Sequence, residues 1–360
     1  MMDWLLHWLF YVGVIMGVVP GMVMFFIWLE RRGLGRFQIR PGPNRAGPFG
    51  VLQPVADAIK VLTKEDIVPA AGDRWVHFIA PLVVFAPAML VFAVIPFQED
   101  GGVVRGLAPD LNIGILYIVA VSSISTIGVF MAAWGSNNKY SLISAFRTMA
   151  QVVSYEIPLA LAILGVVLAA GSMSLTAIVK AQEVPFILMQ PLGFLIFFIA
   201  AAAELNRTPF DLMEADSEMV AGYHIEYSGM KFGLFFLGEY AYTLGISAIA
   251  ATLFLGGWKG PWGIGSEVGV LWLVVKIVLV FLVVLWLRGT FPRVRVDQLM
   301  GFAWKFLFPL SLINIFIVAA ESLAWPGLPW WLLFPNFGIA LVLVVLWSGL
   351  FRLGGGRVQV

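Results

Sequence analysis

Cysteine is absent from the sequence, and histidine is scarce. Without cysteine the chain cannot form disulfides, use a thiolate nucleophile, attach a c-type haem or bind zinc and iron–sulfur clusters through thiolates. A pair of b-type haems would need four axial ligands, and the only histidines are His7, His77 and His224. Glycine patterns of the Rossmann or P-loop type are also missing. We therefore expect no catalytic residue, metal site or redox centre in this chain.

Charged residues are scarce too. They make up 12% of the 360 residues, against roughly 25% in soluble proteins, whereas hydrophobic residues make up 61%. The mean hydropathy is +0.93. The formal net charge of +1 gives no support for nucleic acid as a partner. This composition predicts an all-α polytopic membrane protein, with residues 1–360 forming a single integral membrane domain.

Apolar segments long enough to cross a bilayer, which takes about 20 helical residues, recur along the chain. The first is not expected to be a signal peptide, because its basic residues Arg31, Arg32 and Arg36 follow the apolar stretch. We expect about nine transmembrane helices, at residues 4–29, 77–97, 112–134, 148–170, 186–203, 232–255, 268–287, 302–324 and 331–351.

Basic residues are distributed unevenly between the connecting loops. Most of the 22 Lys and Arg residues fall on one side of the expected bundle. Because cytoplasmic loops carry an excess of these residues, we expect the N-terminus outside and the C-terminus in the cytoplasm. The three largest polar segments, 30–76, 204–231 and 288–305, also fall on the cytoplasmic side. We expect the functional loops there.

Residues 50–64 are amphipathic. Apolar residues recur at helical spacing from Val51 to Leu62, with charged residues between them. This segment is too short and too polar to span a membrane, so it predicts a short amphipathic helix on the membrane surface. Gly and Pro crowd residues 40–50, which predicts an irregular loop before that helix.

Three expected spans contain a carboxylate. These carboxylates are Glu156, Glu239 and Glu321. An ionised carboxylate at the bilayer centre costs at least about 2.5 to 3.5 kcal/mol, so each of these residues needs a partner or a function. The simplest alternative is a neutral glutamic acid that is hydrogen-bonded to Ser or Tyr within the bundle.

The cytoplasmic segment 203–229 is strongly acidic. Its only basic residue is Arg207, and its acids are Glu204, Asp211, Glu214, Asp216, Glu218 and Glu226. Several of these acids are three or four residues apart, which would place them on one face of a helix. Close carboxylates repel one another and can share protons, so the segment favours proton exchange. The alternative is a solvated acidic loop, although apolar residues between the acids indicate partial burial.

Three long strings resemble the H-subunit family of proton-translocating NADH-quinone oxidoreductase, the respiratory complex I. They are ERRGLGRFQIRPGPNRAGPFGVLQPVADAIK (30–60), AELNRTPFDLMEADSEMVAGYHIEYSG (203–229) and RGTFPRVRVDQLMGFAWKFLFPLSL (288–312). Their order and spacing cover nearly the whole chain. The resemblance implies a translocase component of the bacterial inner (plasma) membrane. Such a protein helps to form a quinone-access chamber and couples quinone reduction to proton translocation through a chain of carboxylates.

The resemblance also implies partners and cofactors. The partners would be the peripheral redox arm and the other membrane-arm subunits of the oxidoreductase, together with membrane lipid and quinone. Quinone would be the substrate. NADH, flavin and iron–sulfur clusters would belong to the partner subunits, and this chain alone would bind no cofactor.

Candidate residues follow from the matched strings and from the charge pattern. The quinone-binding candidates are Arg31, Arg36, Arg40, Asp57 and Ala58. The proton-relay candidates are Glu156, Glu204, Asp211, Glu214, Asp216, Glu218, Glu226 and Glu239. The candidates for docking a partner subunit are Arg45, Arg288, Arg293 and Arg295, because segments 30–76 and 288–305 are too long and too rich in Arg for simple hairpins.

Two features depart from the family pattern. Asp216 stands where the family usually has Glu, and most members have eight spans where this chain has a ninth. For the basic residues after the first span, the simplest alternative is membrane topology without any ligand.

Other functions also fit the composition. One is the membrane subunit of a related energy-converting hydrogenase, which differs in its partners. A second is a stand-alone proton-coupled transporter, which would be active after purification by itself. A third is a structural anchor, whose acids could be neutralised without effect.

Overall fold

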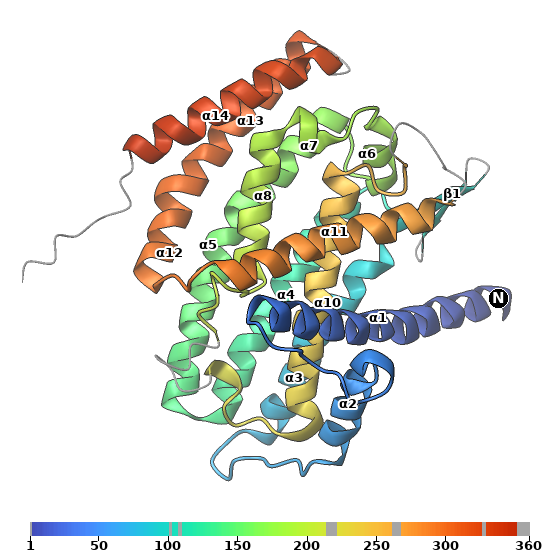
Figure 1. Ribbon diagram of the computed structural model, residues 1–360, viewed down its shortest axis with the longest axis vertical. Coiled ribbons are helices and arrows are strands. Elements are labelled where there is room, and N and C mark those ends of the chain that lie inside the picture. The colour runs from blue at the N-terminus through green and yellow to red at the C-terminus, as the bar shows by residue number, and fades with distance from the viewer. Residues whose placement is uncertain are drawn as a thin grey trace, which may run out of the picture.

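The computed structural model describes residues 2–100, 103–106, 110–213, 222–260, 268–325 and 329–350. It is a bundle of long helices with one small hairpin (Figure 1). The long helices are α1 (Met2–Phe37), α3 (Arg74–Leu90), α4 (Gly114–Ser136), α5 (Lys139–Ala170), α8 (Pro191–Glu204), α10 (Gly229–Phe254), α11 (Gly269–Thr290), α13 (Phe308–Ala324) and α14 (Leu333–Leu350).

Every predicted span overlaps one of these helices. Within the described ranges, seven helices are long and apolar enough to cross a membrane, and α8 is a shorter apolar helix. The prediction of an all-α polytopic membrane protein is therefore confirmed. A short helix, α12 (Val296–Phe302), and a π-helical turn, η6 (Ala303–Leu307), lead directly into α13.

Polar capping residues fix where several helices begin. The Asp73 carboxylate accepts hydrogen bonds from the backbone N–H groups of Trp75 and Val76 at the start of α3. The Asn138 side chain accepts one from the N–H of Tyr140 at the start of α5. Such caps satisfy N–H groups that the first helical turn leaves free. Because of its cap, α5 begins at Lys139, well before the apolar run that predicted a helix from residue 148.

The predicted span at 186–203 is interrupted. Helix α7 (Phe186–Met189) ends at Gln190, whose φ of −129° is not helical, and α8 begins at Pro191. Proline cannot donate a backbone hydrogen bond and disfavours a helical conformation in the residue before it, which explains the break.

The segments between the spans contain more structure than the sequence predicted. Strand β1 (Pro96–Asp100) pairs with β2 (Val103–Gly106) in an antiparallel hairpin. A further helix, α6 (Leu175–Ala181), begins at Ser174, whose hydroxyl accepts a hydrogen bond from the N–H of Ala177. Both segments are too short to give a clear apolar period.

The predicted amphipathic helix is present as α2 (Gln53–Thr63). The Gly- and Pro-rich loop before it contains only a single 3-10 turn, η1 (Pro48–Gly50). Gly50 has a φ of +77°, and a Cβ atom at this position would lie 2.4 Å from the Pro43 carbonyl oxygen. Only glycine fits both the conformation and this close approach.

Helix α10 lies at the centre of the bundle, and α1 and α11 cross it in Figure 1. It also packs against α3, and α5 packs against α8 and α13. Tyr240, Leu244, Ile249 and Phe254 on α10 belong to one continuous hydrophobic core. Helices α13 and α14 lie at one edge of the bundle (Figure 1). This arrangement brings the ends of α1, α8 and α11 together around the middle of α10.

Candidate functional site

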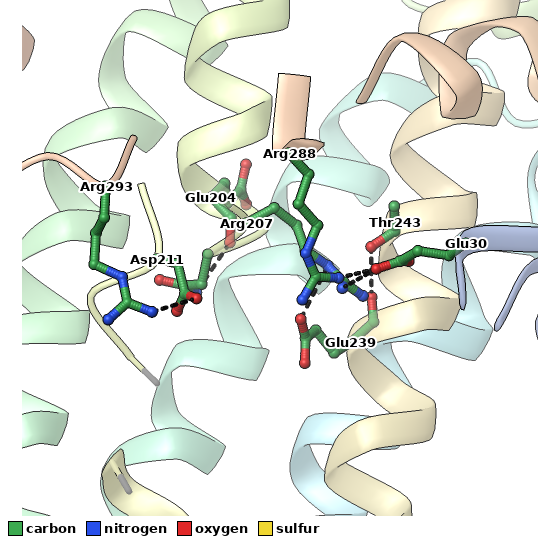
Figure 2. A network of polar contacts seen from close by, with 9 residues as sticks. Glu30, Glu204, Arg207, Asp211, Glu239, Thr243, Arg288 and Arg293 are labelled. Atoms are coloured by element: carbon green, nitrogen blue, oxygen red, sulfur yellow. Dashed lines mark hydrogen bonds and ion pairs between the residues drawn. The ribbon is translucent and has the colours of Figure 1, made fainter. Parts of the chain in front are cut away.

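An ion-pair network joins α1, α10 and α11 to the segment after α8 (Figure 2). Arg207 Nε lies 3.0 Å from Glu239 Oε1, and Arg207 Nη1 lies 3.3 Å from Glu30 Oε1. Arg288 on α11 forms an ion pair with the same oxygen of Glu30. Arg207 and Glu30 are almost fully buried, at 3% and 4% exposure. Two arginines and two glutamates thus balance one another inside the bundle.

A reversal of the chain after α8 directs Arg207 into this network. Asn206 has a φ of +51°, in the left-handed region that Asn tolerates better than most residues. The Gln151 side-chain amide donates hydrogen bonds to the carbonyls of Ala203 (2.7 Å) and Phe210 (2.8 Å), on either side of the turn. The Arg207 guanidinium then lies over the Tyr240 ring, 4.2 Å from its centroid, which adds a cation–π contact.

A second group of acids has hydroxyl partners. The Tyr242 hydroxyl donates a hydrogen bond to Glu204 Oε1 at 2.5 Å, and Glu204 is 6% exposed. The Ser123 hydroxyl donates to Glu156 Oε1. Glu204, Tyr242 and Glu239 line one small cavity of about 60 Å³, which has room for several water molecules. This cavity connects the hydroxyl-bonded acid Glu204 to the ion-pair network.

The remaining relay candidates are only partly described. Asp211 is buried and lies 3.1 Å from Arg293 Nη2, and Glu226 Oε1 accepts a hydrogen bond from the Asn138 amide at 2.8 Å. Three candidates, Glu214, Asp216 and Glu218, lie outside the described residues. The structure therefore brings Glu204 and Glu239 to one cavity and gives Asp211 and Glu226 other partners.

A larger cavity of about 740 Å³ lies between α1, α2 and α10. Apolar and aromatic side chains such as Ile27, Phe232 and Phe236 form much of its wall. Three of the quinone-binding candidates, Arg31, Asp57 and Ala58, also line it. Arg31 forms an ion pair with Asp57, and the Gln53 amide donates to Asp57 Oδ1 at 3.1 Å.

The wall of this cavity and the ion-pair network share the same helical turns. On α1, Arg31 lines the cavity and its neighbour Glu30 joins the network. On α10, Phe236 and Leu237 line the cavity and Glu239 joins the network. A change of charge at the cavity wall is therefore one helical turn or less from buried ion pairs, where electrostatic interactions are only weakly screened.

The other quinone-binding candidates lie elsewhere. Arg36 lines a separate groove of about 510 Å³ between α1 and α11, and Arg40 is exposed in the turn after α1. The docking candidates also divide into two kinds. Arg45 and Arg295 are exposed. Arg288 and Arg293 form ion pairs within the chain, as described above.

Sequence reasoning assigned no role to Glu30, Arg207 or Tyr242. The sequence signal for Glu30 was a lone acid at the C-terminal end of a long apolar stretch, where a buried carboxylate needs a basic partner. Its partners lie 177 and 258 residues further along the chain, so sequence spacing could not reveal them. Arg207 was visible as the only base in an acidic segment.

The described residues contain no group of three or more His, Asp or Glu side chains that could hold a metal ion. His77 is fully buried, and its ring stacks on Tyr227 at 3.9 Å between centroids. His224 packs against Phe232. Both histidines thus contribute to aromatic packing in this structure.

An α-helical membrane bundle that combines an apolar cavity with a buried charged network is typical of a membrane protein that handles lipid-soluble substrates or protons. Residues 10–319 match the family model described as NADH dehydrogenase. The H subunit of the NADH-quinone oxidoreductase from Dehalococcoides mccartyi (strain CBDB1) is 59% identical, with both chains fully covered.

More distant relatives carry the same name. One such H subunit, from Syntrophobacter fumaroxidans, is 51% identical over 87% of this chain and 95% of its own length. Another, from Geobacillus kaustophilus, is 50% identical over 87% of this chain and 92% of its own length. The chain belongs to the H-subunit family of NADH-quinone oxidoreductase, as the three matched strings predicted.

Proposed function

We propose that this chain is the membrane subunit of an NADH-quinone oxidoreductase that encloses quinone and transmits its reduction to a buried chain of carboxylates. The observation that carries this proposal is that the 740 Å³ cavity and the Glu30–Arg207–Glu239–Arg288 network use residues of the same helical turns of α1 and α10. The names of the full-length relatives support the assignment to this enzyme complex.

The 740 Å³ cavity has the features that a quinone needs. Its apolar wall can accommodate an isoprenoid tail, and the Arg31–Asp57 pair offers polar contacts to a headgroup. Ala58 is small and exposed on α2, which leaves space at the cavity edge. We assign Arg31, Asp57 and Ala58 to this chamber, and Arg36 and Arg40 to the basic rim around its approach.

Reduction of a quinone to a quinol takes up two electrons and two protons. The electrons come from a redox centre in a partner subunit, since this chain has no cysteine for a cluster. Added negative charge at the headgroup attracts Arg31 and displaces α1, which also carries Glu30. This displacement weakens the ion pairs that Glu30 and Glu239 form with Arg207. Arg207 is shared by these two carboxylates, so a small displacement changes the balance at both.

The change in the Arg207 ion pairs then alters the protonation of the acids that are hydrogen-bonded to hydroxyl groups. Glu239 and Glu204 line one cavity, and the Tyr242 hydroxyl donates a hydrogen bond to Glu204. Protons then redistribute between Glu204 and Glu156, which are both hydrogen-bonded to hydroxyl groups. Glu239 keeps its charge beside Arg207 and changes the electrostatic potential at Glu204. Asp211, Glu214, Asp216, Glu218 and Glu226 would supply protons from the cytoplasmic side.

The same proposal gives the chain its place in the assembly. The N-terminus lies outside and the C-terminus in the cytoplasm of a bacterial inner membrane, so the loops at 30–76, 204–231 and 288–305 face the peripheral redox arm. Exposed Arg45 and Arg295 contact that arm. Arg288 and Arg293 hold the loops in shape through Glu30 and Asp211, and membrane-arm subunits and lipid cover the remaining surface.

The variant Glu204→Gln tests this function, because it keeps the shape of the side chain and removes its titratable group. In the assembled complex it should lower quinone reduction and proton pumping together, while NADH oxidation by an artificial acceptor of the soluble arm stays normal. The control is Glu321→Gln, which neutralises another buried carboxylate, one that does not line the 60 Å³ cavity. Wild-type pumping in Glu204→Gln would contradict the proposal.

A further inference from the structure

Four polar side chains meet inside the bundle where α14 joins it, away from the network described above. Gln190 lies at the break between α7 and α8, Asn314 and Glu321 lie on α13, and Asn336 lies on α14. All four are at least nine-tenths buried. None of them has a part in the proposed quinone and proton chemistry.

Some of their polar atoms are already bonded. The Asn336 amide donates to the Met189 carbonyl at 2.7 Å and to Glu321 Oε2 at 3.2 Å. The Gln190 amide donates to the Gly165 carbonyl at 3.4 Å. These bonds use the amide nitrogens of Asn336 and Gln190, so the two amide oxygens remain available to accept hydrogen bonds.

Three further atoms lack a partner among the residues that the structure describes. They are the acceptors Gln190 Oε1 and Asn336 Oδ1 and the donor Asn314 Nδ2. Their residues line one cavity of about 20 Å³ together with Glu321. A Cβ atom built on Gly193 would lie 3.3 Å from Asn314 Nδ2 and 3.5 Å from Gln190 Oε1, so these two atoms flank the same space.

A single water molecule matches this set of atoms. Water can donate two hydrogen bonds, here to Gln190 Oε1 and Asn336 Oδ1, and can accept one from Asn314 Nδ2. An internal water needs about 10 to 15 Å³ and two to four polar partners. An apolar ligand would leave all three atoms unsatisfied, which is costly in a membrane interior.

We propose that Gln190, Asn314 and Asn336 bind one internal water beside Glu321, and that this hydrated cluster attaches α14 to the bundle. The reason is the small buried surface of α14: only 11% of its most apolar stretch is buried within the chain. Lipid tails are as apolar as its side chains, so the apolar contacts of Leu333, Ala340 and Leu343 with the core compete with similar contacts to lipid. Apart from this cluster, α14 is tied to η6 by a hydrogen bond from Trp347 Nε1 to the Lys305 carbonyl.

The water is tested by a high-resolution electron cryomicroscopy map of the intact membrane complex. We expect a separate density peak within hydrogen-bonding distance of Gln190 Oε1, Asn314 Nδ2 and Asn336 Oδ1. The variant Asn314→Leu fills the space and should remove the peak. A wild-type map in which Gln190 and Asn314 bond directly, with no peak between them, would overturn the water site.

The attachment of α14 is tested by labelling a thiol at its buried face. Because the chain has no cysteine, Ala340→Cys introduces its only thiol, on a half-buried residue that lines the same cavity. In the assembled complex, adding Glu321→Leu or Asn314→Leu should raise the maleimide labelling of this thiol, roughly threefold for each hydrogen bond lost. Mass spectrometry of the labelled peptide gives the rate.

Two matched variants complete this test. Phe316→Leu changes an exposed residue on α13 and should leave labelling unchanged, and Glu321→Gln keeps an acceptor for Asn336 and should also resemble the parent. Equal labelling in the parent and in both Leu variants of the cluster would overturn the anchoring role. Neither readout requires turnover, so the result is independent of the proposed quinone chemistry.

Discussion

Glu239 and Glu204 line the same cavity of about 60 Å³, but they are held in different ways. Glu239 pairs with Arg207, which also pairs with Glu30. Glu204 accepts a hydrogen bond from Tyr242 and has no ion pair with the described basic residues. A carboxylate paired with arginine must keep its charge, because losing it would leave a buried cation uncompensated. A hydroxyl-bonded acid can exchange a proton without breaking an ion pair.

This difference between the two carboxylates indicates that they have different roles. The Glu30–Arg207–Glu239–Arg288 network joins helices α1, α10 and α11. In the proposed function it also responds to a change of charge at the cavity wall. The acids bonded to hydroxyl groups are Glu204 and Glu156. In the proposed function these two acids are the groups that change protonation. Each variant below affects one of these two arrangements or the cavity beside them.

The largest effect is expected for Arg207→Gln. This variant removes the arginine that pairs with both Glu30 and Glu239, and leaves Arg288 as a basic partner of Glu30. Removing one member of a buried ion pair typically costs about 3 to 5 kcal/mol. We expect little of this protein in the assembled complex, as measured by native gel electrophoresis of membranes. The control is Arg293→Gln, because the Arg293 pair with Asp211 is about one-third exposed on the arginine side. Equal assembly of the two variants would show that the network is not structural.

A smaller effect is expected for Tyr242→Phe, which removes only the hydroxyl group bonded to Glu204. The variant should assemble, because the ring remains and no ion pair is broken. Quinone turnover should fall by about a hundredfold if the hydroxyl transfers protons in the rate-limiting step. Tyr117→Phe is the matched control, since its hydroxyl donates to the Leu90 carbonyl at 3.4 Å and Tyr117 does not line this cavity. A Tyr242→Phe enzyme with normal turnover would remove Tyr242 from the relay.

A change at the cavity edge should affect substrate entry alone. Ala58→Leu places a larger side chain at the edge of the 740 Å³ cavity, so the apparent KM for quinone should rise severalfold with little change in kcat. Ala56→Leu is the matched control, because Ala56 is an exposed residue of α2 outside the lining. Steady-state kinetics at several quinone concentrations distinguish the two variants. Identical KM values would place the entrance elsewhere.

The smallest effect is expected for Asp57→Asn. The Arg31–Asp57 pair is 40% and 33% exposed, and pairs of this kind contribute about 0 to 1 kcal/mol to stability. Assembly should therefore be normal, with a KM change smaller than that of Ala58→Leu. Thermal unfolding of the purified complex provides the check on stability. A loss of assembly would mean that this pair is structural, as the Arg207 pairs are.

The sequence predicted the helical bundle well because helices that cross a membrane are strongly enriched in apolar residues. Apolar length located the spans, and apolar periodicity located α2. Features set by local backbone chemistry were missed: the early start of α5 at its Asn138 cap, the break at Gln190 before Pro191 and the β1–β2 hairpin. Each of these features depends on one or two residues. Apolar content averaged over about 20 residues does not reveal such local effects.

The site was only partly predictable for a different reason. Arg31, Asp57 and Ala58 were predicted together and do line one cavity, because they belong to two neighbouring segments. The pairing of Glu30 with Arg207 and Arg288 joins segments 177 and 258 residues apart. Arg288 was predicted to dock a partner, and its ion pair within the chain came from the tertiary fold alone.

We expect that reduction of quinone changes the protonation of Glu204, whose carboxylate accepts a hydrogen bond from the Tyr242 hydroxyl. Infrared difference spectroscopy of the intact complex, recorded between the oxidised and reduced quinone states, measures the carboxyl bands directly. We expect a carboxyl band in the difference spectrum that is lost in Glu204→Gln and retained in Glu321→Gln. A difference spectrum that is the same in the parent and in Glu204→Gln would contradict the account.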